Sequence, residues 1–382
     1  MADNGGTDRR TGARRPVPLA RPCFSQHELG AVRRVMQSCH VTQGPETAAF
    51  EADLSALVGG RETVAVSSGG AALLLAMHAI GIGPGDEVVV PDFVFPAAAM
   101  GAMFMGAVPV PADVETETMA MTPETAARCI TPRTKAVVAV HPFGIPADIE
   151  GIVQACPEGV PVIEDAACAL GGLTAGGAAA GTVGRISCFS FHPRKSITTG
   201  EGGCLAASGS DADRLRRLRD YGRTGRGFGD VFGEIGMNFR MSDLAAAIGR
   251  VQLERVHESI STRQKLFSRY ATNLGDIAGL RIPGGYLRPG NTFQSLVARV
   301  QVDARALVSE LAARGVQSGP SAHSLRGQTA FAARYPGLAG AGDGSGRMLA
   351  EHTVVLPLFD RMTFKDVDFV CEAVRDALRH MA

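Results

Sequence analysis

Seven short apolar runs, most of them in the first half of the chain, constrain its fold more than any other feature. They cover residues 64–66, 88–91, 108–114, 136–140, 160–163, 186–191 and 203–207. Several are apolar at nearly every position, which is typical of strands buried on both faces. Helical patterns separate the earlier runs, and strand-helix alternation predicts an α/β protein. We therefore expect a mostly parallel seven-stranded sheet flanked by helices.

The last two of these runs differ from the others. Between 186–191 and 203–207 the sequence has no helical pattern. A parallel connection usually contains a helix. We therefore expect a local antiparallel or edge arrangement at this point.

A different pattern follows the seventh run. A long helical stretch covers residues 241–272. It is followed by a predicted strand (296–302), a helix (304–314), a loop rich in Gly and Ser up to about 346, a short apolar run (354–358) and a last helix (364–378). This succession predicts a smaller α+β domain, and we expect the Gly-rich stretch 337–346 to be mobile. The predicted units are a disordered tail (1–15), a large domain (16–255) and a small C-terminal domain (256–382).

The composition excludes several classes of protein. Lys+Arg and Asp+Glu both number 38, so the net charge is zero and no broad attraction to nucleic acid or anionic membranes is implied. No apolar run reaches the ~20 residues that span a bilayer, and the first residues lack a secretory signal. The eight cysteines show no zinc-ligand spacing and are typical of a reducing compartment. We expect a cytoplasmic protein with no metal site.

A single lysine lies on the loop between the last two apolar runs. Lys195 follows His192, Pro193 and Arg194, and Gly200-Glu201-Gly202-Gly203 comes after it. Burying an ammonium costs several kcal/mol or shifts its pKa, so lysine is unusual at such a strand end. A desolvated lysine amine is suited to Schiff-base formation with an aldehyde. The alternative is a surface lysine in a Gly-rich hairpin.

This segment and several others resemble the DegT-type (DegT/StrS) pyridoxal-phosphate (PLP) sugar aminotransferases. The matching motifs occur in the order found in that family, over about residues 17–378, and include 186–206, Glu164-Asp165-Ala166-Ala167 and 236–243. The resemblance implies PLP as the cofactor and the PLP-dependent transferase fold of type I. Lys195 would form the Schiff base with PLP and move protons as a general base and acid.

Two carboxylates end the fifth apolar segment, where ligands bind in open α/β sheets. An ionised Asp165 there would keep the PLP ring nitrogen protonated, and the family aspartate in this motif has that role. The simpler alternative is a helix N-cap. We expect Glu164 to be structural and count Asp165 with Lys195 as the catalytic pair.

A Gly-rich turn between the first run and the next helix is the candidate phosphate site. The backbone N–H groups of Gly69, Gly70 and Ala71 and the helix dipole would favour a dianion there. The family usually has Thr where this chain has Gly70, so one hydroxyl contact is lost. Ser190 resembles the family serine that reaches the same phosphate, and an ordinary strand serine is the less favoured alternative.

The resemblance implies three further cofactor contacts. Phe95 occupies the place of the family aromatic that stacks on the PLP ring, whereas Phe93 is expected in the core. Cys168 stands where the family often has Gln near the ring hydroxyl, and a thiol is a weak donor. Asn238 matches an asparagine that the neighbouring subunit supplies to the phosphate, which implies a homodimer with shared active sites.

Three departures from the family pattern fall where the substrate would bind. His40, in Cys39-His40-Val41-Thr42, replaces the usual tryptophan, and Ile145 replaces a common glutamine. Arg326, in Ser324-Leu325-Arg326, stands where many relatives have histidine and could pair with a carboxylate. A solvated surface arginine is the equal alternative. We list His40 and Arg326 as candidate substrate-binding residues.

The function that follows is amino transfer from an amino acid, glutamate or glutamine by resemblance, to a keto sugar or related keto or cyclitol acceptor. The setting would be amino-sugar or antibiotic biosynthesis. Two alternatives stay open. One is a PLP-dependent dehydratase or an aromatising enzyme of the aminobenzoate type, and the other is a PLP-binding regulatory protein without catalysis.

Overall fold

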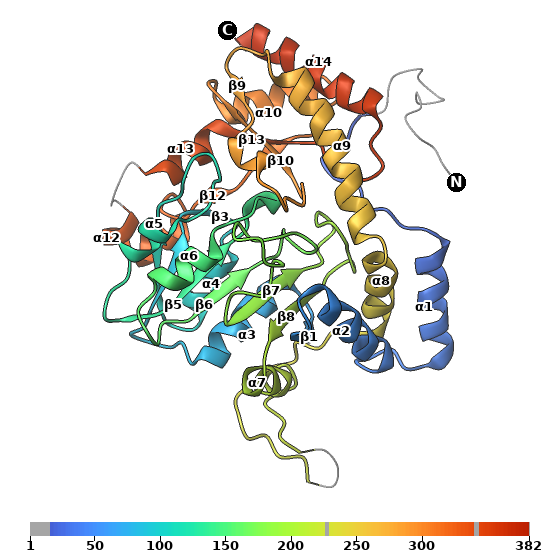
Figure 1. The fold of residues 1–382 in the computed structure, drawn as a ribbon, viewed down its shortest axis with the longest axis vertical. Helices are drawn as coiled ribbons and strands as arrows, with labels where there is room; N and C mark the ends of the chain where they lie inside the picture. Colours follow the sequence, from blue (N-terminus) through green and yellow to red (C-terminus); the bar gives the residue numbers. More distant parts are fainter. Residues whose placement is uncertain (1–15, 226–228, 340–343, 382) are drawn as a thin grey trace.

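A seven-stranded sheet forms the centre of the computed structural model, which describes residues 16–225, 229–339 and 344–381 (Figure 1). Its strands are β1 (Glu62–Val66), β2 (Glu87–Pro91), β4 (Val108–Ala112), β5 (Thr134–Val140), β6 (Val162–Asp165), β7 (Ile186–Ser190) and β8 (Gly203–Ala207). They lie in the order β1-β8-β7-β6-β5-β2-β4, with β8 antiparallel to both neighbours and the other pairs parallel. The predicted α/β sheet is confirmed, and each predicted run forms one strand.

The antiparallel pairing of β7 with β8 is also confirmed. However, β8 is not an edge strand, because β1 pairs along its other side. The edge position therefore belongs to β1, which the sequence pattern alone does not reveal. The predicted tail (1–15) and the middle of the predicted mobile loop (337–346) lie outside the described residues.

Alternate residues of the strands enter cores on opposite faces of the sheet, as the pleat of a strand requires. Val88 and Val90 pack with α3 (Gly69–Ile80), α4 (Ala97–Phe104) and α7 (Ser210–Leu218). Their neighbour Val89 faces the other way, toward α5 (Pro123–Ala127) and α6 (Ile149–Ala155). On that second face, Ala65 and Phe189 pack with α2 (Pro45–Leu57) and α8 (Asp243–Leu253). Both faces are apolar, which explains the near-continuous apolar runs.

The C-terminal part builds a second, four-stranded antiparallel sheet with its own apolar core. Its strands lie in the order β11 (Gly319–Pro320), β13 (Thr353–Leu356), β10 (Leu296–Val300) and β9 (Leu280–Arg281). The helices that pack there are α9 (Val256–Leu274), α10 (Ala304–Ala313), α13 (Ser345–His352) and α14 (Phe364–Met381). Figure 1 shows this unit above the central sheet. The exact domain boundary between residues 255 and 256 stays a prediction.

Two expectations about this region were wrong in detail. The helical stretch 241–272 is two helices, α8 and α9, because the chain leaves helical geometry at Arg255 (φ −109°, ψ 7°). The break lets α8 stay on the large sheet while α9 runs to the C-terminal unit (Figure 1). The region expected as a loop up to about 346 contains β11, β12 (His323–Ser324), α11 (Thr329–Arg334), α12 (Pro336–Ala339) and the start of α13. Elements this short carry no periodic signal.

The remaining elements connect these units. Helix α1 (Gln26–Ser38) begins with a capping box formed by Ser25 and Glu28 and packs on α8. A two-residue strand, β3 (Phe93–Val94), pairs with β12. Two short 3-10 helices are η1 (Pro142–Gly144) and η2 (Gly284–Leu287). After α7 the chain projects from the body as an arm and returns (Figure 1). Within the described residues, no helix is long and apolar enough to cross a membrane.

Candidate active site

The candidate residues meet at one edge of the sheet, where the parallel strands end. The register aligns Val66 of β1, Gly203 of β8 and Ser190 of β7, so the turn after β1 lies near the end of β7. Asp165, the last residue of β6, pairs with Val140 of β5 and with Cys188 of β7, two residues before Ser190. Ligands bind beyond the carboxyl ends of strands in folds of this kind. The predicted residues at 67–71, 165 and 190 therefore share one edge.

Lys195 lies on the β7–β8 connection and is half-buried. Its backbone N–H donates to His192 O at 2.8 Å, and the loop closes where Phe191 N donates to Gly202 O at 2.9 Å. The Lys195 Nζ donates to Cys168 Sγ at 3.1 Å. Cys168 comes from the turn after β6, so two separate connections bring the amine and the thiol together. The surface-hairpin alternative for Lys195 does not hold, because its amine faces another loop of the site.

Asp165 ends β6 with its side chain almost fully buried. Its Oδ1 accepts the N–H of Ala167 at 3.0 Å. Burial raises the pKa of Asp165 above its usual range, while the Ala167 N–H and the positive charge of Lys195 pull this pKa down. A buried carboxylate in this state would be stabilised by a further cationic partner. The protonated ring nitrogen of PLP is such a partner, so Asp165 fits the predicted cofactor.

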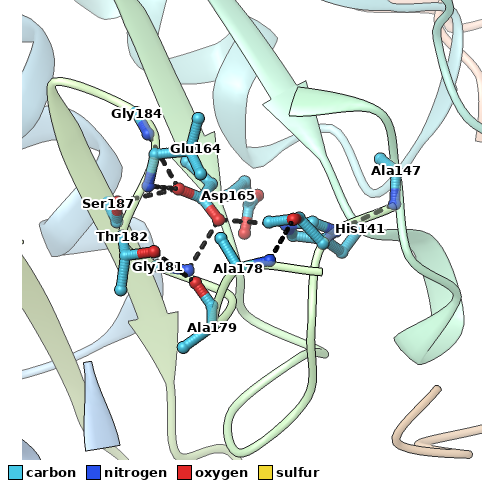
Figure 2. Close-up of polar contacts among 12 residues, drawn as sticks. His141, Ala147, Glu164, Asp165, Ala178, Ala179, Gly181, Thr182, Gly184 and Ser187 are labelled. Atoms are coloured by element: carbon cyan, nitrogen blue, oxygen red, sulfur yellow. Dashed lines mark hydrogen bonds and ion pairs between the residues drawn. The ribbon is translucent and has the colours of Figure 1, made fainter. Parts of the chain in front are cut away.

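Glu164, the neighbour of Asp165 on β6, has a structural environment (Figure 2). Its carboxylate accepts the N–H groups of Gly181, Val183 and Gly184 at 2.6, 3.1 and 2.9 Å. His141 Nε2 lies 3.1 Å from the same carboxylate. Burial opposes ionisation of Glu164, but these hydrogen bonds outweigh it and lower the pKa to about 2. Glu164 therefore anchors the loop before β7, the structural role that we expected.

The tautomer of His141 follows from its second hydrogen bond. Its Nδ1 accepts the N–H of Ala147 at 3.0 Å, so the ring proton is on Nε2 and is donated to Glu164. The His141 side chain is fully buried just past the end of β5. His141 is not among the site residues expected from the sequence. A histidine directly after a buried strand, at the edge that carries Asp165 and Ser190, was the available signal.

The turn after β1 forms a cradle at the N-terminus of α3. Ser68 caps this helix, because its Oγ accepts the N–H of Ala71 at 3.1 Å. The first-turn N–H groups of Gly69 and Gly70 have no acceptor within the helix. A Cβ on Gly69 would lie 2.7 Å from the Ser190 Cβ, so only glycine allows Ser190 this close. Amide groups, a hydroxyl and a helix N-terminus together suit a phosphate dianion.

Phe95 and Phe93 have the opposite environments that their predicted roles require. Phe93 is 1% exposed and lies in the core of the C-terminal unit. Phe95, two residues on, is 72% exposed, although a phenylalanine in water is unfavourable. It follows the end of β2, so it belongs to the same edge of the sheet as Asp165. Its ring is thus accessible for stacking, and the stacking role itself stays a prediction.

Asn238 lies where the projecting arm returns to the sheet. Its side chain is exposed, and its Oδ1 accepts the N–H of Arg240 at 3.3 Å. The carbonyl of the next residue, Phe239, accepts the N–H of Ser67 in the cradle at 2.9 Å. The arm is therefore tied to its own cradle through the backbone, while the Asn238 amide faces outward. A role toward a second chain stays a prediction.

The two candidate substrate-binding residues, His40 and Arg326, differ in their exposure and in their hydrogen bonds. His40 is exposed after α1 and packs against Gly44, since a Cβ there would lie 2.2 Å from His40 Nε2. Arg326 is not a solvated surface residue: its guanidinium donates to Leu338 O at 2.7 Å and to Pro111 O at 2.6 Å. Binding a substrate carboxylate through Arg326 would require breaking these bonds. Ile145 is fully buried.

Taken together, the edge offers an amine next to a thiol, a buried carboxylate and an anion cradle within one group of loops. An amine at this position can capture an aldehyde and later take up or release a proton. The carboxylate can hold a cation, and the cradle can hold a phosphate. PLP carries an aldehyde, a basic ring nitrogen and a phosphate, so the residues present fit it.

Comparison with known proteins agrees with this chemistry. Residues 22–375 match the model of the DegT/DnrJ/EryC1/StrS aminotransferase family. The chain is similar to the aminotransferase TlmJ from Streptoalloteichus hindustanus, with 34% identity, 96% of this chain and 100% of TlmJ covered, and a TM-score of 0.89.

Two further solved structures cover nearly the whole chain. The PLP form of Spr1654 from Streptococcus pneumoniae is 24% identical and superimposes with a TM-score of 0.86 over 96% of this chain and 100% of that protein. A 3-amino-5-hydroxybenzoic acid synthase is 27% identical, with a TM-score of 0.84 over 95% of this chain and 100% of that protein.

Proposed function

The chain belongs to the DegT/DnrJ/EryC1/StrS aminotransferase family, is a PLP-dependent aminotransferase and has the fold of type I PLP-dependent transferases. On this premise we propose that it transfers an amino group from glutamate or glutamine to a keto sugar or a related keto or cyclitol acceptor. The observation that carries the proposal is the Lys195 amine, held 3.1 Å from Cys168 at the edge where Asp165 ends β6.

Each residue would have a defined task toward the cofactor. PLP, when bound, supplies a ring that withdraws electrons from the carbon bearing the amino group. Lys195 Nζ would hold the PLP aldehyde and, once the amine of the donor has displaced it, the freed Nζ would take a proton from the substrate and return it. Asp165 holds the positive charge of the ring nitrogen in place. Gly69, Gly70 and Ser190 hold the phosphate, and Phe95 covers one face of the ring.

We further propose that the enzyme is a homodimer in which Asn238 of each chain completes the site of the other. The exposed amide of Asn238 supports this, as do apolar side chains on the arm, such as Ile235 at 85% exposure and Met237 at 59%. The experiment mixes two inactive variants, Lys195→Ala and Asn238→Ala, unfolds them together and refolds them. Shared sites predict partial recovery of activity in the mixture, and sites built from one chain predict none.

The acceptor is expected to differ from the nucleotide-linked keto-hexoses of many relatives. His40 supports this, because an imidazole is smaller and more polar than the tryptophan usual at that place. Keto sugars, cyclitol ketones and keto acids, each tested with glutamate or glutamine as donor, would identify the acceptor class. If an ordinary nucleotide-linked 4-keto sugar is turned over at least as fast as every other acceptor, the proposed difference in acceptor is wrong. We assign the enzyme to amino-sugar or antibiotic biosynthesis in the cytoplasm, which the family resemblance and the free cysteines support.

A second candidate is an aromatising enzyme of the aminobenzoate type. The similarity to 3-amino-5-hydroxybenzoic acid synthase over nearly the whole chain favours it. The two functions differ in their products. Loss of water and appearance of ultraviolet absorbance from an aromatic amine would identify the second, whereas an aliphatic amine formed with 2-oxoglutarate from glutamate identifies the first.

A further inference from the structure

A short polar segment of the C-terminal unit, residues 291–295, reaches back to the candidate active site. It lies between η2 and β10, and four of its residues are buried polar side chains: Asn291, Thr292, Gln294 and Ser295. Such a cluster next to a strand is costly unless each group is bonded. The partners of Thr292 and Gln294 are therefore informative.

Thr292 is bonded to the turn that carries Cys168. Its Oγ1 donates to Cys168 O at 2.6 Å, and its backbone N–H donates to Gly144 O at 3.1 Å. The side chain is fully buried between two glycines, because a Cβ on Gly144 would lie 2.2 Å from Oγ1 and one on Gly172 would lie 2.6 Å from Cγ2. Thr292 thus fits a space that permits little displacement.

Gln294 is bonded to the residue before Lys195. Its Nε2 donates to Arg194 O at 2.6 Å, and its Oε1 accepts the hydroxyl of Ser295 at 3.0 Å. Its own carbonyl accepts Arg263 Nη1 at 2.9 Å, while Arg263 Nε contacts Asp360 at 2.7 Å. The Gln294 amide is therefore fixed at both ends.

The segment also has a fixed backbone. Asn291 Oδ1 accepts the N–H of Phe293 at 2.6 Å, and Phe293 adopts a positive φ of 51°, which is unusual for a bulky residue. A strained conformation persists only where the surroundings impose it. Thr292 and Gln294 are thus presented from a rigid support to two different loops.

We propose that Thr292 and Gln294 are positioning residues that hold the Cys168 and Lys195 loops in register, so that the Lys195 Nζ meets PLP. This inference rests on the proposed function of Lys195. Thr292 bonds the carbonyl of Cys168, whose Sγ accepts the Lys195 Nζ at 3.1 Å, and Gln294 bonds the carbonyl of the residue directly before Lys195. Lys195 has a long flexible side chain, so fixing its backbone reduces the freedom lost when it captures a ligand.

The test compares variants that remove one hydrogen bond each with a matched control. Thr292→Val and Gln294→Met keep the approximate size of the side chain and remove the donor. Thr353→Val is the control, because Thr353 is also fully buried and its hydroxyl donates to a carbonyl, Leu349 O, away from Lys195. The titratable side chains that interact with Lys195 are Asp165, Cys168 and His192, and none of them is substituted in these variants.

The readout is the binding constant for PLP, with covalent capture at Lys195 checked by borohydride reduction and peptide mass spectrometry. Thr292→Val and Gln294→Met should weaken capture by roughly two- to tenfold, the equivalent of one hydrogen bond, while Thr353→Val should leave it unchanged. Thr292→Ser, which keeps the hydroxyl, should restore capture. Thermal unfolding of each variant without PLP shows that all are folded.

The outcomes separate this inference from the proposed function. If wild-type protein does not capture PLP at Lys195, the function itself is wrong. If the wild type captures PLP and Thr292→Val and Gln294→Met bind it as tightly as Thr353→Val does, only the positioning role is wrong.

Discussion

His141 Nε2 donates to Glu164 Oε1 across 3.1 Å, and neither side chain is accessible to solvent (Figure 2). The pair joins the ends of β5 and β6, and Glu164 is the residue directly before Asp165. Because His141 Nδ1 accepts the Ala147 N–H, its Nε2–H points at Glu164, and the hydrogen bonds to Glu164 keep the negative charge on that carboxylate. The chain therefore keeps one buried anion for structure next to a second that faces the cofactor site.

Glu164→Gln should destabilise the protein at neutral pH. The amide would turn an N–H group toward the backbone donors of the 181–184 loop, which a carboxylate satisfies and an amide cannot. The difference between the ordinary pKa of 4.5 and about 2 corresponds to on the order of 3 kcal/mol of unfolding free energy. Denaturant unfolding at pH 7 measures it, with the exposed Glu254→Gln as the control.

The pH dependence of this effect has a definite sign. A carboxyl whose folded pKa is lowered stabilises the protein fully above its unfolded pKa, near 4.5, and loses that stabilisation as the pH falls toward about 2. The difference in unfolding free energy between wild type and Glu164→Gln should therefore shrink between these pH values. A difference that stays constant over this range would show that Glu164 is not ionised in the folded protein.

Asp165→Asn should separate stability from cofactor binding. Burial raises the folded pKa of Asp165, so its ionised form at neutral pH destabilises the protein without cofactor, and stability falls as the pH rises from the unfolded value toward the folded one. Asparagine removes the charge and keeps an oxygen for the Ala167 N–H. We expect a higher Tm without PLP and weaker PLP binding. A lower Tm together with unchanged PLP affinity would contradict the assignment.

The two glycines of the cradle should respond differently to substitution. Gly69→Ala places a Cβ 2.7 Å from the Ser190 Cβ and should weaken PLP binding about tenfold or more. Gly70→Thr should be tolerated, because a Cβ there meets only Ser68 Oγ, at 3.8 Å, and the added hydroxyl could reach the phosphate. Gly83→Ala, in open space, is the control. Equal PLP affinities for Gly69→Ala and Gly83→Ala would place the phosphate elsewhere.

The large sheet could be predicted from the sequence because its strands are buried on both faces, which leaves unmistakable apolar runs such as Val88–Val90. The parts that could not be predicted depend on tertiary contacts. The break at Arg255 lies inside an unbroken helical pattern, and β12 has two residues that pair with β3 from far along the chain. Neither feature changes the local periodicity.

The candidate active site likewise has residues that could be predicted from the sequence and residues that could not. Lys195, Asp165 and the 69–71 turn could be found because each follows or precedes a recognisable strand within a motif. Thr292 and Gln294 could not, because their importance depends on which carbonyls they meet, and those belong to loops more than 90 residues away. For Arg326, residue type suggested an anion-binding side chain, but Pro111 O and Leu338 O already bond its guanidinium.

The most direct test of the account is covalent trapping of PLP. The sequence contains four lysines, and Lys135, Lys265 and Lys365 are exposed whereas Lys195 is half-buried against Cys168. After incubation with PLP, borohydride reduction and digestion, mass spectrometry should find the PLP-derived mass on Lys195, and Lys195→Ala of unchanged Tm should carry none at stoichiometric PLP. A stoichiometric label on another lysine, or a label retained by Lys195→Ala, would contradict the central claim.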